Sequence, residues 1–308
     1  VLDCLAKAKT EEACQVAEDL LLEMERIAEQ QGNSVPSIAS VLPDSVSYAI
    51  IINAFASVGK AEKAEMIAET MVEKYARGGD RYKRLVPNTR CFNNVLLAWA
   101  QRSKTTSSPE APARAEAIIE RMNRLYKTSG IPVKPNIVSY NILLDCWGNS
   151  IFDDAATRAL AILRQMQQSV DKDMQPDTNS WNTVIAAYAR TGSITRAEQL
   201  VQEMYTRQKT DEILVAKPTL RTWNTLLTAC AKSRSSDALE KAERSMSRME
   251  ELYQSGHLNA KADVVSFNNL LVCVARSGRG GIGERCEAIV AEMRARWALG
   301  ENTKPNAR

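Results

Sequence analysis

The sequence predicts an all-α fold, a solenoid of repeated helix–turn–helix units, and three observations lead to this prediction. A Pro-Asp, Pro-Asn or Pro-Thr step, replaced by Ala262-Asp263 in one copy, is followed four residues later by an aromatic residue, and this pattern recurs along the 308 residues. The aromatic residues are separated by 44, 48, 41, 42 and 44 residues. A small residue and, seven residues later, a methionine also return in every copy. A period of this size is typical of solenoids and not of a single globular core. The aromatic residues are Tyr48, Phe92, Tyr140, Trp181, Trp223 and Phe267.

The first helix of each unit is predicted around the aromatic position. Trp181, Val184, Ile185 and Tyr188 fall at i, i+3, i+4 and i+7, which is the spacing of an amphipathic helix and not of a strand. Proline in the preceding step cannot continue the earlier helix, and the Asp or Asn that usually follows it caps the next one.

The second helix of each unit is predicted around the methionine. Ala197, Leu200, Val201 and Met204 repeat the helical spacing. The small residue and the methionine share a face, where the first permits close helix approach and the second fills the remaining gap. The pairs are Ala17 and Met24, Ala64 and Met71, Ala115 and Met122, Ala159 and Met166, Ala197 and Met204, Ala242 and Met249, and Cys286 and Met293.

Glycines mark the turn between the two helices in three units. Gly59, Gly192 and Gly278 each lie eleven residues after the aromatic position, and glycine tolerates the left-handed backbone that ends a helix. The stretch Gly278–Gly283 superficially resembles a phosphate loop. It lacks a preceding strand and a Gly-Lys-Ser/Thr ending, so we interpret it as an interhelical turn.

The motif divides the chain into one continuous array of repeats. Residues 1–44 hold the C-terminal part of a truncated repeat, and six repeats follow at 45–88, 89–136, 137–177, 178–219, 220–263 and 264–306. The chain begins with Val1 inside a unit. We therefore expect a fragment or a trimmed segment, from which any targeting segment is absent.

Composition excludes several classes of protein. The chain is 44% hydrophobic and 25% charged, as in a soluble folded protein. No apolar run approaches the roughly 18 residues that span a membrane, so we expect no membrane insertion. The seven cysteines show no metal or disulfide pattern, and a single histidine argues against a zinc site and a catalytic triad. We expect no enzyme and no cofactor. Four cysteines are expected in the core of first helices: Cys91, Cys146, Cys230 and Cys273.

The residue after the aromatic carries the functional prediction. It is asparagine in five of six copies and Ala49 in the first. Asparagine is a mediocre helix former, so its recurrence inside a helix needs a reason. Helix capping is not that reason, because the Asp, Asn or Thr five residues earlier already occupies the capping position. A donor and an acceptor edge repeated once per unit indicate recognition of a ligand. The asparagines are Asn93, Asn141, Asn182, Asn224 and Asn268.

These units resemble the pentatricopeptide repeat, although they are longer than is usual in that family. The resemblance rests on the Val-x-Tyr-Asn start, seen at Val138–Asn141, on the Ala and Met of the second helix, and on the Lys-Pro-Asp/Asn end, seen at Lys134–Asn136. It implies a right-handed α-α superhelix of helix pairs that binds single-stranded RNA, one base per repeat. The surplus length predicts extra turns on the second helices and longer loops.

In this family the residue after the aromatic and the last residue of the unit together choose the base. The resemblance therefore pairs Ala49 with Asn88, Asn93 with Asn136, Asn141 with Asp177, Asn182 with Thr219, Asn224 with Asp263, and Asn268 with Asn306. It implies that Asn with Asp reads uracil, Asn with Asn a pyrimidine, and Asn with Thr a pyrimidine weakly, and it assigns no base to Ala with Asn.

The residue two before the aromatic sandwiches the base in this family. The corresponding residues here are Val46, Arg90, Val138, Asn179, Arg221 and Val265. Valine is the family's preference, and a guanidinium plane also stacks on a base. Asn179 departs furthest from the pattern.

Cations near the ends of the last three complete first helices suggest phosphate contacts. The net charge is only +3, so their distribution matters more than their sum. The position nine residues after the aromatic holds uncharged residues in the first three repeats and then Arg190, Lys232 and Arg276. Complementing the helix dipole is the alternative role for these cations.

The sequence thus predicts sequence-selective binding of pyrimidine-rich single-stranded RNA in organellar RNA processing, stabilisation or translation. The resemblance implies a mitochondrion or a chloroplast as the location and single-stranded RNA as the partner, together with other proteins of an RNA-processing or ribosomal assembly. Two alternatives stay open. One is a helical-repeat scaffold in a ribonucleoprotein or protein assembly, and the other is the RNA-binding arm of an enzyme whose catalytic domain lies outside this chain.

Overall fold

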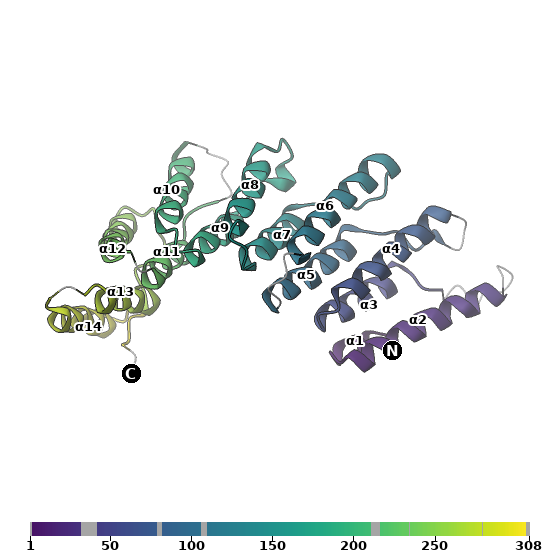
Figure 1. Ribbon diagram of the computed structural model, residues 1–308, viewed down its shortest axis with the longest axis horizontal. Coiled ribbons are helices and arrows are strands. Elements are labelled where there is room, and N and C mark those ends of the chain that lie inside the picture. Colours follow the sequence, from purple (N-terminus) through teal and green to yellow (C-terminus); the bar gives the residue numbers. More distant parts are fainter. Residues whose placement is uncertain are drawn as a thin grey trace. The chain divides into compact units, whose positions relative to one another are not determined.

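All regular structure in the described part of the chain is helical. The computed structural model describes residues 2–31, 42–78, 82–105, 110–210, 216–233, 235–278 and 280–305. Within these ranges it contains fourteen α-helices and one short 3-10 helix, η4 (Lys172–Met174), and no strand (Figure 1). The prediction of an all-α fold is confirmed.

The α-helices follow one another in pairs. The first helices are α1 (Leu2–Lys7), α3 (Ser45–Ser57), α5 (Thr89–Thr105), α7 (Ile137–Asn149), α9 (Thr178–Arg190), α11 (Leu220–Lys232) and α13 (Val264–Arg276). The second helices are α2 (Glu11–Gln31), α4 (Ala61–Arg77), α6 (Glu110–Ser129), α8 (Ala155–Gln168), α10 (Ile194–Thr210), α12 (Ala238–Gln254) and α14 (Ile282–Ala298). Five first helices have 13 residues, whereas α4, α10, α12 and α14 have 17.

The chain forms two compact units, and the same packing occurs in each. The first comprises Val1–Phe152 and Asp171–Met174, and the second comprises Asp153–Val170 and Gln175–Arg308. In the first unit α1, α3, α5 and α7 pack on one another in order, while α2, α4 and α6 pack against the first helix of their own pair and of the next. In the second unit α9, α11 and α13 form the corresponding row, and α10 and α12 pack in the same way.

The first helix of each full repeat begins directly after the residue predicted to cap it. Asn136 Oδ1 accepts the backbone N–H of Ser139 at 3.1 Å, and Ser139 Oγ accepts the backbone N–H of Asn136 at 3.2 Å. Such a reciprocal capping box satisfies two helix-end donors at once. The asparagine five residues later is therefore not the cap, as predicted. Capping boxes also form at Asp177, Thr219 and Asp263.

The small residues and methionines of the second helices lie in the core in the full repeats, whereas Met24 on α2 of the truncated repeat is half-buried. Ala64, Ala115 and Ala159 are fully buried, and so are Met71 and Met122. The remaining full repeats follow the same rule except at Cys286, which is half-buried. The core expectation for the first-helix cysteines Cys91, Cys146, Cys230 and Cys273 is confirmed.

The predicted turn glycines adopt the backbone that the prediction requires. Gly59 and Gly192 both have φ of 75°, a left-handed conformation that other residues adopt only with strain. No described helix is both long enough and apolar enough to cross a bilayer. No group of His, Cys, Asp and Glu in the described residues is arranged to hold a metal ion.

Ion pairs connect successive second helices, with the acid usually on the earlier helix. In the first unit the pairs are Glu18 with Lys63 at 3.2 Å, Glu25 with Lys74 at 2.5 Å, and Glu69 with Arg121 at 3.1 Å. In the second unit Glu198 pairs with Arg244 at 3.5 Å and Glu250 with Arg296 at 3.2 Å. Partly exposed pairs contribute little stability individually. Their consequence is that much of the basic charge on the second helices is neutralised.

Candidate nucleic-acid interface

The side chain two before the aromatic is exposed in every repeat. Val46 is 60% exposed, Val138 49% and Val265 50%. Arg90, Asn179 and Arg221 are exposed at the same position. An apolar side chain left this open on the second residue of a helix does not contribute to the core. The position that the resemblance assigns to base stacking thus faces solvent.

The asparagine position lies between this exposed position and the core. Asn93, Asn141, Asn224 and Asn268 are half-buried, as is Ala49 in the first repeat. Asn182 is more deeply buried, with 6% exposure. The position is three residues from the exposed one, so both lie on one face of the first helix.

Asn224 and Asp263 form a direct hydrogen bond within the second unit. Asn224 Nδ2 donates to Asp263 Oδ1 at 3.1 Å. Asn224 Oδ1 in turn accepts from Ser266 Oγ at 2.6 Å. Asp263 and Ser266 are the cap and the third residue of α13. One amide of α11 is thus held at both ends by the start of the next first helix.

In the first unit the hydroxyl of Ser139 links Asn93 to Asn136, as the hydroxyl of Ser266 links Asn224 to Asp263. Asn93 Oδ1 accepts from Ser139 Oγ at 2.6 Å. Ser139 also lies 3.2 Å from Asn136 Oδ1 through the same hydroxyl. Asn93 and Asn136 are therefore linked indirectly, through the hydroxyl of Ser139.

The pair Asn182 and Thr219 lacks this link. Thr222 occupies the place of the serine, and its Oγ1 lies 3.3 Å from Thr219 Oγ1 and accepts the backbone N–H of Thr219 at 3.0 Å. Asn182 Oδ1 is buried and has no hydrogen-bond partner among the described residues. An unsatisfied buried acceptor costs stability.

The three remaining predicted pairs are placed as follows. Asn88 Oδ1 accepts the backbone N–H of Cys91 at 3.1 Å, and its partner Ala49 has no polar side-chain atom to offer. Asn141 belongs to the first compact unit and Asp177 to the second. Asn306, the partner of Asn268, lies outside the described residues.

The predicted cation positions end the first helices of the second unit. Arg190 and Lys232 are exposed and make no ion pair with any described acid. Arg276 is exposed too, and its Nη1 donates to the carbonyl oxygen of Ala231 at 2.5 Å. That contact lies at the C-terminal end of α11, so Arg276 also complements the dipole of that helix.

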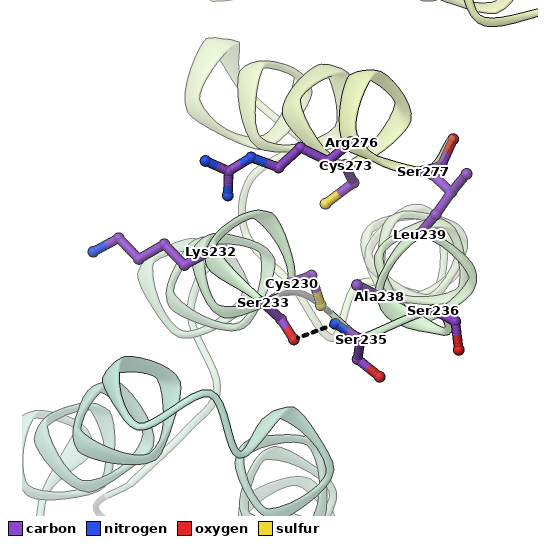
Figure 2. Close-up of a pocket in the computed structure, with 10 residues that line it drawn as sticks. All are labelled: Cys230, Lys232, Ser233, Ser235, Ser236, Ala238, Leu239, Cys273, Arg276 and Ser277. Carbon is purple, nitrogen blue, oxygen red and sulfur yellow. Dashed lines mark hydrogen bonds between the residues drawn. The ribbon is translucent and has the colours of Figure 1, made fainter. Parts of the chain in front are cut away.

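Lys232 and Arg276 contribute to the wall of a cavity of about 550 Å³ between the ends of α11, α12 and α13. Figure 2 shows both side chains extending in the same direction, with the thiols of Cys230 and Cys273 further inside. Burial raises the pKa of Cys230 to about 12 and that of Cys273 to about 11, so both thiols stay protonated at neutral pH. Serines complete the polar part of the lining: Ser233, Ser235, Ser236 and Ser277.

The hydroxyl residue that precedes the aromatic was not among the predicted site residues. Ser139 and Ser266 contact the asparagines of the preceding repeat, which lie 46 and 42 residues earlier. A signal was available, because a serine or threonine stands at this position in five of six repeats. Its capping function concealed a second contact that no local pattern reveals.

Tryptophan residues of the first unit join neighbouring repeats, and this was not predicted either. Trp99 Nε1 donates to Glu65 Oε2 at 2.9 Å, and Trp147 Nε1 donates to Glu116 Oε1 at 2.8 Å. Each glutamate directly follows a core alanine of the preceding second helix. The pattern of the glutamates alone shows only a partly polar helix face.

Two segments match family models. Residues 161–233 match the pentatricopeptide repeat domain, and residues 46–75 match the PPR repeat. Two curated relatives from Arabidopsis thaliana share the sequence over longer stretches. Pentatricopeptide repeat-containing protein At5g25630 is 26% identical over 251 residues, covering 79% of this chain and 37% of the relative. Pentatricopeptide repeat-containing protein At3g09650, chloroplastic, is 29% identical over 174 residues, covering 56% and 19%. The chain thus spans well under half the length of each relative.

A crystal structure of the pentatricopeptide repeat protein PPR10 in complex with an 18-nt psaJ RNA element also matches. Its sequence is 19% identical, the match covers 91% of this chain and 38% of that one, and the TM-score is 0.39. Independently of this structure, the repeated motif, the two family-model matches and the two relatives show that this chain is similar to pentatricopeptide repeat proteins.

Proposed function

We propose that this chain binds pyrimidine-rich single-stranded RNA, with one base at each repeat, through the exposed side of its first helices. The observation that carries the proposal is the network of Asn224, Asp263 and Ser266. An amide fixed at both ends presents the same donor and the same acceptor to every ligand, as selection among bases requires.

The chemistry of the amide matches a pyrimidine edge. One hydrogen of Asn224 Nδ2 is used by Asp263 and one lone pair of Oδ1 by Ser266. One hydrogen and one lone pair remain for a ligand. Uracil offers a donor beside an acceptor, and cytosine offers the same two groups in the opposite order. An amide held in one orientation can pair with only one of these two orders and so distinguishes uracil from cytosine. The family resemblance assigns a pair of Asn and Asp to uracil.

The pair Asn93 and Asn136 supports a less selective site. Ser139 holds Asn93 Oδ1, but Asn136 has no carboxylate with which to hold the amide nitrogen. The family resemblance assigns Asn with Asn to either pyrimidine. A weaker hold on the nitrogen is the physical reason that we offer for this broader choice.

The exposed side chains two before the aromatic supply surfaces on which bases can stack. Val138 is 49% exposed and Val265 is 50% exposed. Bases that cover these valines bury apolar surface, which favours binding regardless of base identity. Arg90 and Arg221 offer guanidinium planes at the same position.

The cations at the ends of α9, α11 and α13 are suited to contact phosphates. The lysines and arginines of the ion pairs between second helices already have acidic partners. Arg190 and Lys232 have none among the described residues, and Arg276 bonds a carbonyl oxygen that carries no net charge. Unneutralised cations along one row attract a polyanion more strongly than paired ones.

The target that we propose reads, from the repeat that begins at residue 45 onward, any base, pyrimidine, uracil, weakly pyrimidine, uracil, pyrimidine. By family polarity this is the 5′ to 3′ direction. The corresponding process is organellar RNA processing, stabilisation or translation. The word chloroplastic in the name of one relative supports an organelle, and we extend the proposal to mitochondrion or chloroplast.

The test measures binding of the purified chain to RNAs that differ from this target at single bases. We expect Asn224→Thr to lose the preference for uracil at the fifth base and to gain a preference for guanine there. The reason is that, by the family resemblance, a pair of Thr and Asp reads guanine. The loss should be on the order of 1–3 kcal/mol, the scale of a single mismatched base. Asn93→Thr is the matched control, and its effect should fall on the second base instead.

Equal binding of purine and pyrimidine tracts by the wild-type chain would contradict base reading. That result would favour the scaffold in a ribonucleoprotein or protein assembly. If the chain does select among RNAs, that result is also compatible with the chain being the RNA-binding arm of a larger processing enzyme.

A further inference from the structure

We propose that the hydroxyl residue at the third position of each first helix is a positioning residue for the base-reading asparagine of the preceding repeat. This inference rests on the RNA-binding function proposed above. We call it the N3 residue. The N3 residues of the six full repeats are Ser47, Cys91, Ser139, Ser180, Thr222 and Ser266.

The first step is to find the hydrogen of the Ser266 hydroxyl. A hydroxyl has one hydrogen and two lone pairs. The backbone N–H of Asp263 donates to Ser266 Oγ at 3.1 Å and so uses a lone pair. Ser266 Oγ lies 2.6 Å from Asn224 Oδ1 and 3.1 Å from Asp263 Oδ1. The hydrogen goes to the nearer oxygen, that of Asn224.

The same arrangement recurs in the other compact unit. The backbone N–H of Asn136 donates to Ser139 Oγ at 3.2 Å, and Ser139 Oγ donates to Asn93 Oδ1 at 2.6 Å. The cap differs between the two cases, being Asn136 in one and Asp263 in the other. The contact to the asparagine therefore does not depend on the identity of the cap.

The second step concerns the orientation of the amide. A carboxamide is nearly symmetric in shape, so it chooses between two flipped orientations by its hydrogen bonds. A donating hydroxyl specifies that the oxygen of Asn224 points toward α13, and the carboxylate of Asp263 specifies that the nitrogen points toward itself. Loss of the hydroxyl removes one of these two constraints. The amide should then offer either edge to a base.

The distribution of residues within the chain agrees with this role. Where the asparagine is replaced by Ala49, the following N3 residue is Cys91, a much weaker hydrogen-bond donor. Thr222 pairs with Thr219, and Asn182 Oδ1 stays without a partner among the described residues. Among the repeats that carry an asparagine, the one with Asn182 should accordingly discriminate uracil from cytosine least.

The experiment uses Ser266→Ala in the full chain and RNAs that vary at the fifth or the sixth base. We expect the preference for uracil over cytosine at the fifth base to fall roughly 2- to 10-fold, the range of one lost hydrogen bond. Selectivity at the sixth base should be unchanged, although Ser266 itself belongs to the sixth repeat. This displacement by one repeat distinguishes positioning from a loss of local structure.

Ser47→Ala is the matched control for the lost capping contact. Ser47 bonds Asp44 through its backbone nitrogen and its hydroxyl, both at 2.9 Å. The position of a preceding asparagine would fall before Val1, so no asparagine of this chain depends on it. It should lower the melting temperature less than Ser266→Ala, which also loses the contact to Asn224, and it should leave selectivity unaltered.

A double-mutant cycle of Ser266→Ala and Asn224→Ala, measured by thermal unfolding without RNA, tests the contact itself. We expect the two changes to be non-additive, whereas additive effects would overturn the contact. A wild-type chain that discriminates bases and a Ser266→Ala variant that does so equally well would overturn the positioning role alone. A wild-type chain that binds all RNAs alike would instead overturn the proposed function, and the positioning role with it.

Discussion

The side chains of Asn224 and Asp263, 39 residues apart in the sequence, are joined by a hydrogen bond of 3.1 Å from Nδ2 to Oδ1. Asp263 Oδ1 also accepts the backbone N–H of Ser266 at 3.0 Å. One carboxylate therefore caps α13 and holds an amide on α11. Helix initiation and the candidate recognition group share a side chain, so the two functions can be separated only by substitutions that keep the cap.

Asp263→Asn is such a substitution. Asn136 caps α7 as Asp263 caps α13, and Asn and Asp are nearly equal as caps, so the stability should change by less than about 0.5 kcal/mol. An amide can turn its own nitrogen toward Asn224, which a carboxylate cannot. The preference for uracil over cytosine at the fifth base should therefore decrease when binding to single-base RNA variants is measured. Asp44→Asn is the control, and an unchanged preference in Asp263→Asn would contradict the role of the carboxylate.

Replacement of Arg190, Lys232 and Arg276 by alanine should weaken binding to all RNA sequences alike. Each lost phosphate contact with a single strand removes about 0.7 from the log–log salt slope, so the slope should fall by roughly two. Titrations at several salt concentrations measure this. The control replaces three paired cations of second helices, Lys63, Arg121 and Arg244, and should change the slope much less. Equal slopes for the wild-type and variant chains would mean that the three cations complement the helix dipoles and do not contact phosphates.

Met71→Ala should destabilise the fold strongly because Met71 is fully buried on α4. Truncation of a core methionine costs about 2–5 kcal/mol, which includes the cavity that it leaves. Met66→Ala on the same helix is the matched control, since Met66 is 55% exposed and its loss should stay within about 0.5 kcal/mol. Chemical denaturation of both variants gives the comparison. Similar midpoints would mean that the methionine position does not anchor the repeat.

Glu65 should make stability depend on pH. Burial raises the pKa of Glu65 above its ordinary value, and the hydrogen bond from Trp99 and the charge of Arg114 oppose that shift only in part. A carboxyl group with a raised pKa in the folded state contributes stability below its unfolded pKa, and this contribution is lost as the pH rises through the folded pKa.

Glu65→Gln keeps an acceptor for Trp99 and cannot ionise. It should therefore be more stable than the wild type at pH 7, and the advantage should shrink as the pH falls toward the ordinary value of a glutamate. Thermal melting of both chains over this range measures the difference. Trp99→Phe removes the donor that lowers the pKa of Glu65, so its stability should fall off at a higher pH than that of the wild type. A pH-independent difference between Glu65→Gln and wild type would contradict this account.

Much of the fold follows from local patterns. The period of apolar residues predicted helices on both sides of Gly59 and Gly192, and both glycines adopt the left-handed conformation. The capping positions were predictable because a helix cap depends on residues within one turn of it. Burial of Met71 and Ala64 was predictable because residues seven apart lie on one face of a helix.

The sequence by itself determined which residues begin the first helices of the six full repeats, which helix faces are buried and which side chains repeat on the exposed face. Only the tertiary structure decided that Ser266 donates to Asn224, that Trp99 bonds Glu65, and that Asn182 has no equivalent partner among the described residues. The physical reason is that helical periodicity gives the angle of a residue around its own axis. It does not give the shift of one helix along its neighbour, and hydrogen bonds between repeats require that shift to within a fraction of an ångström.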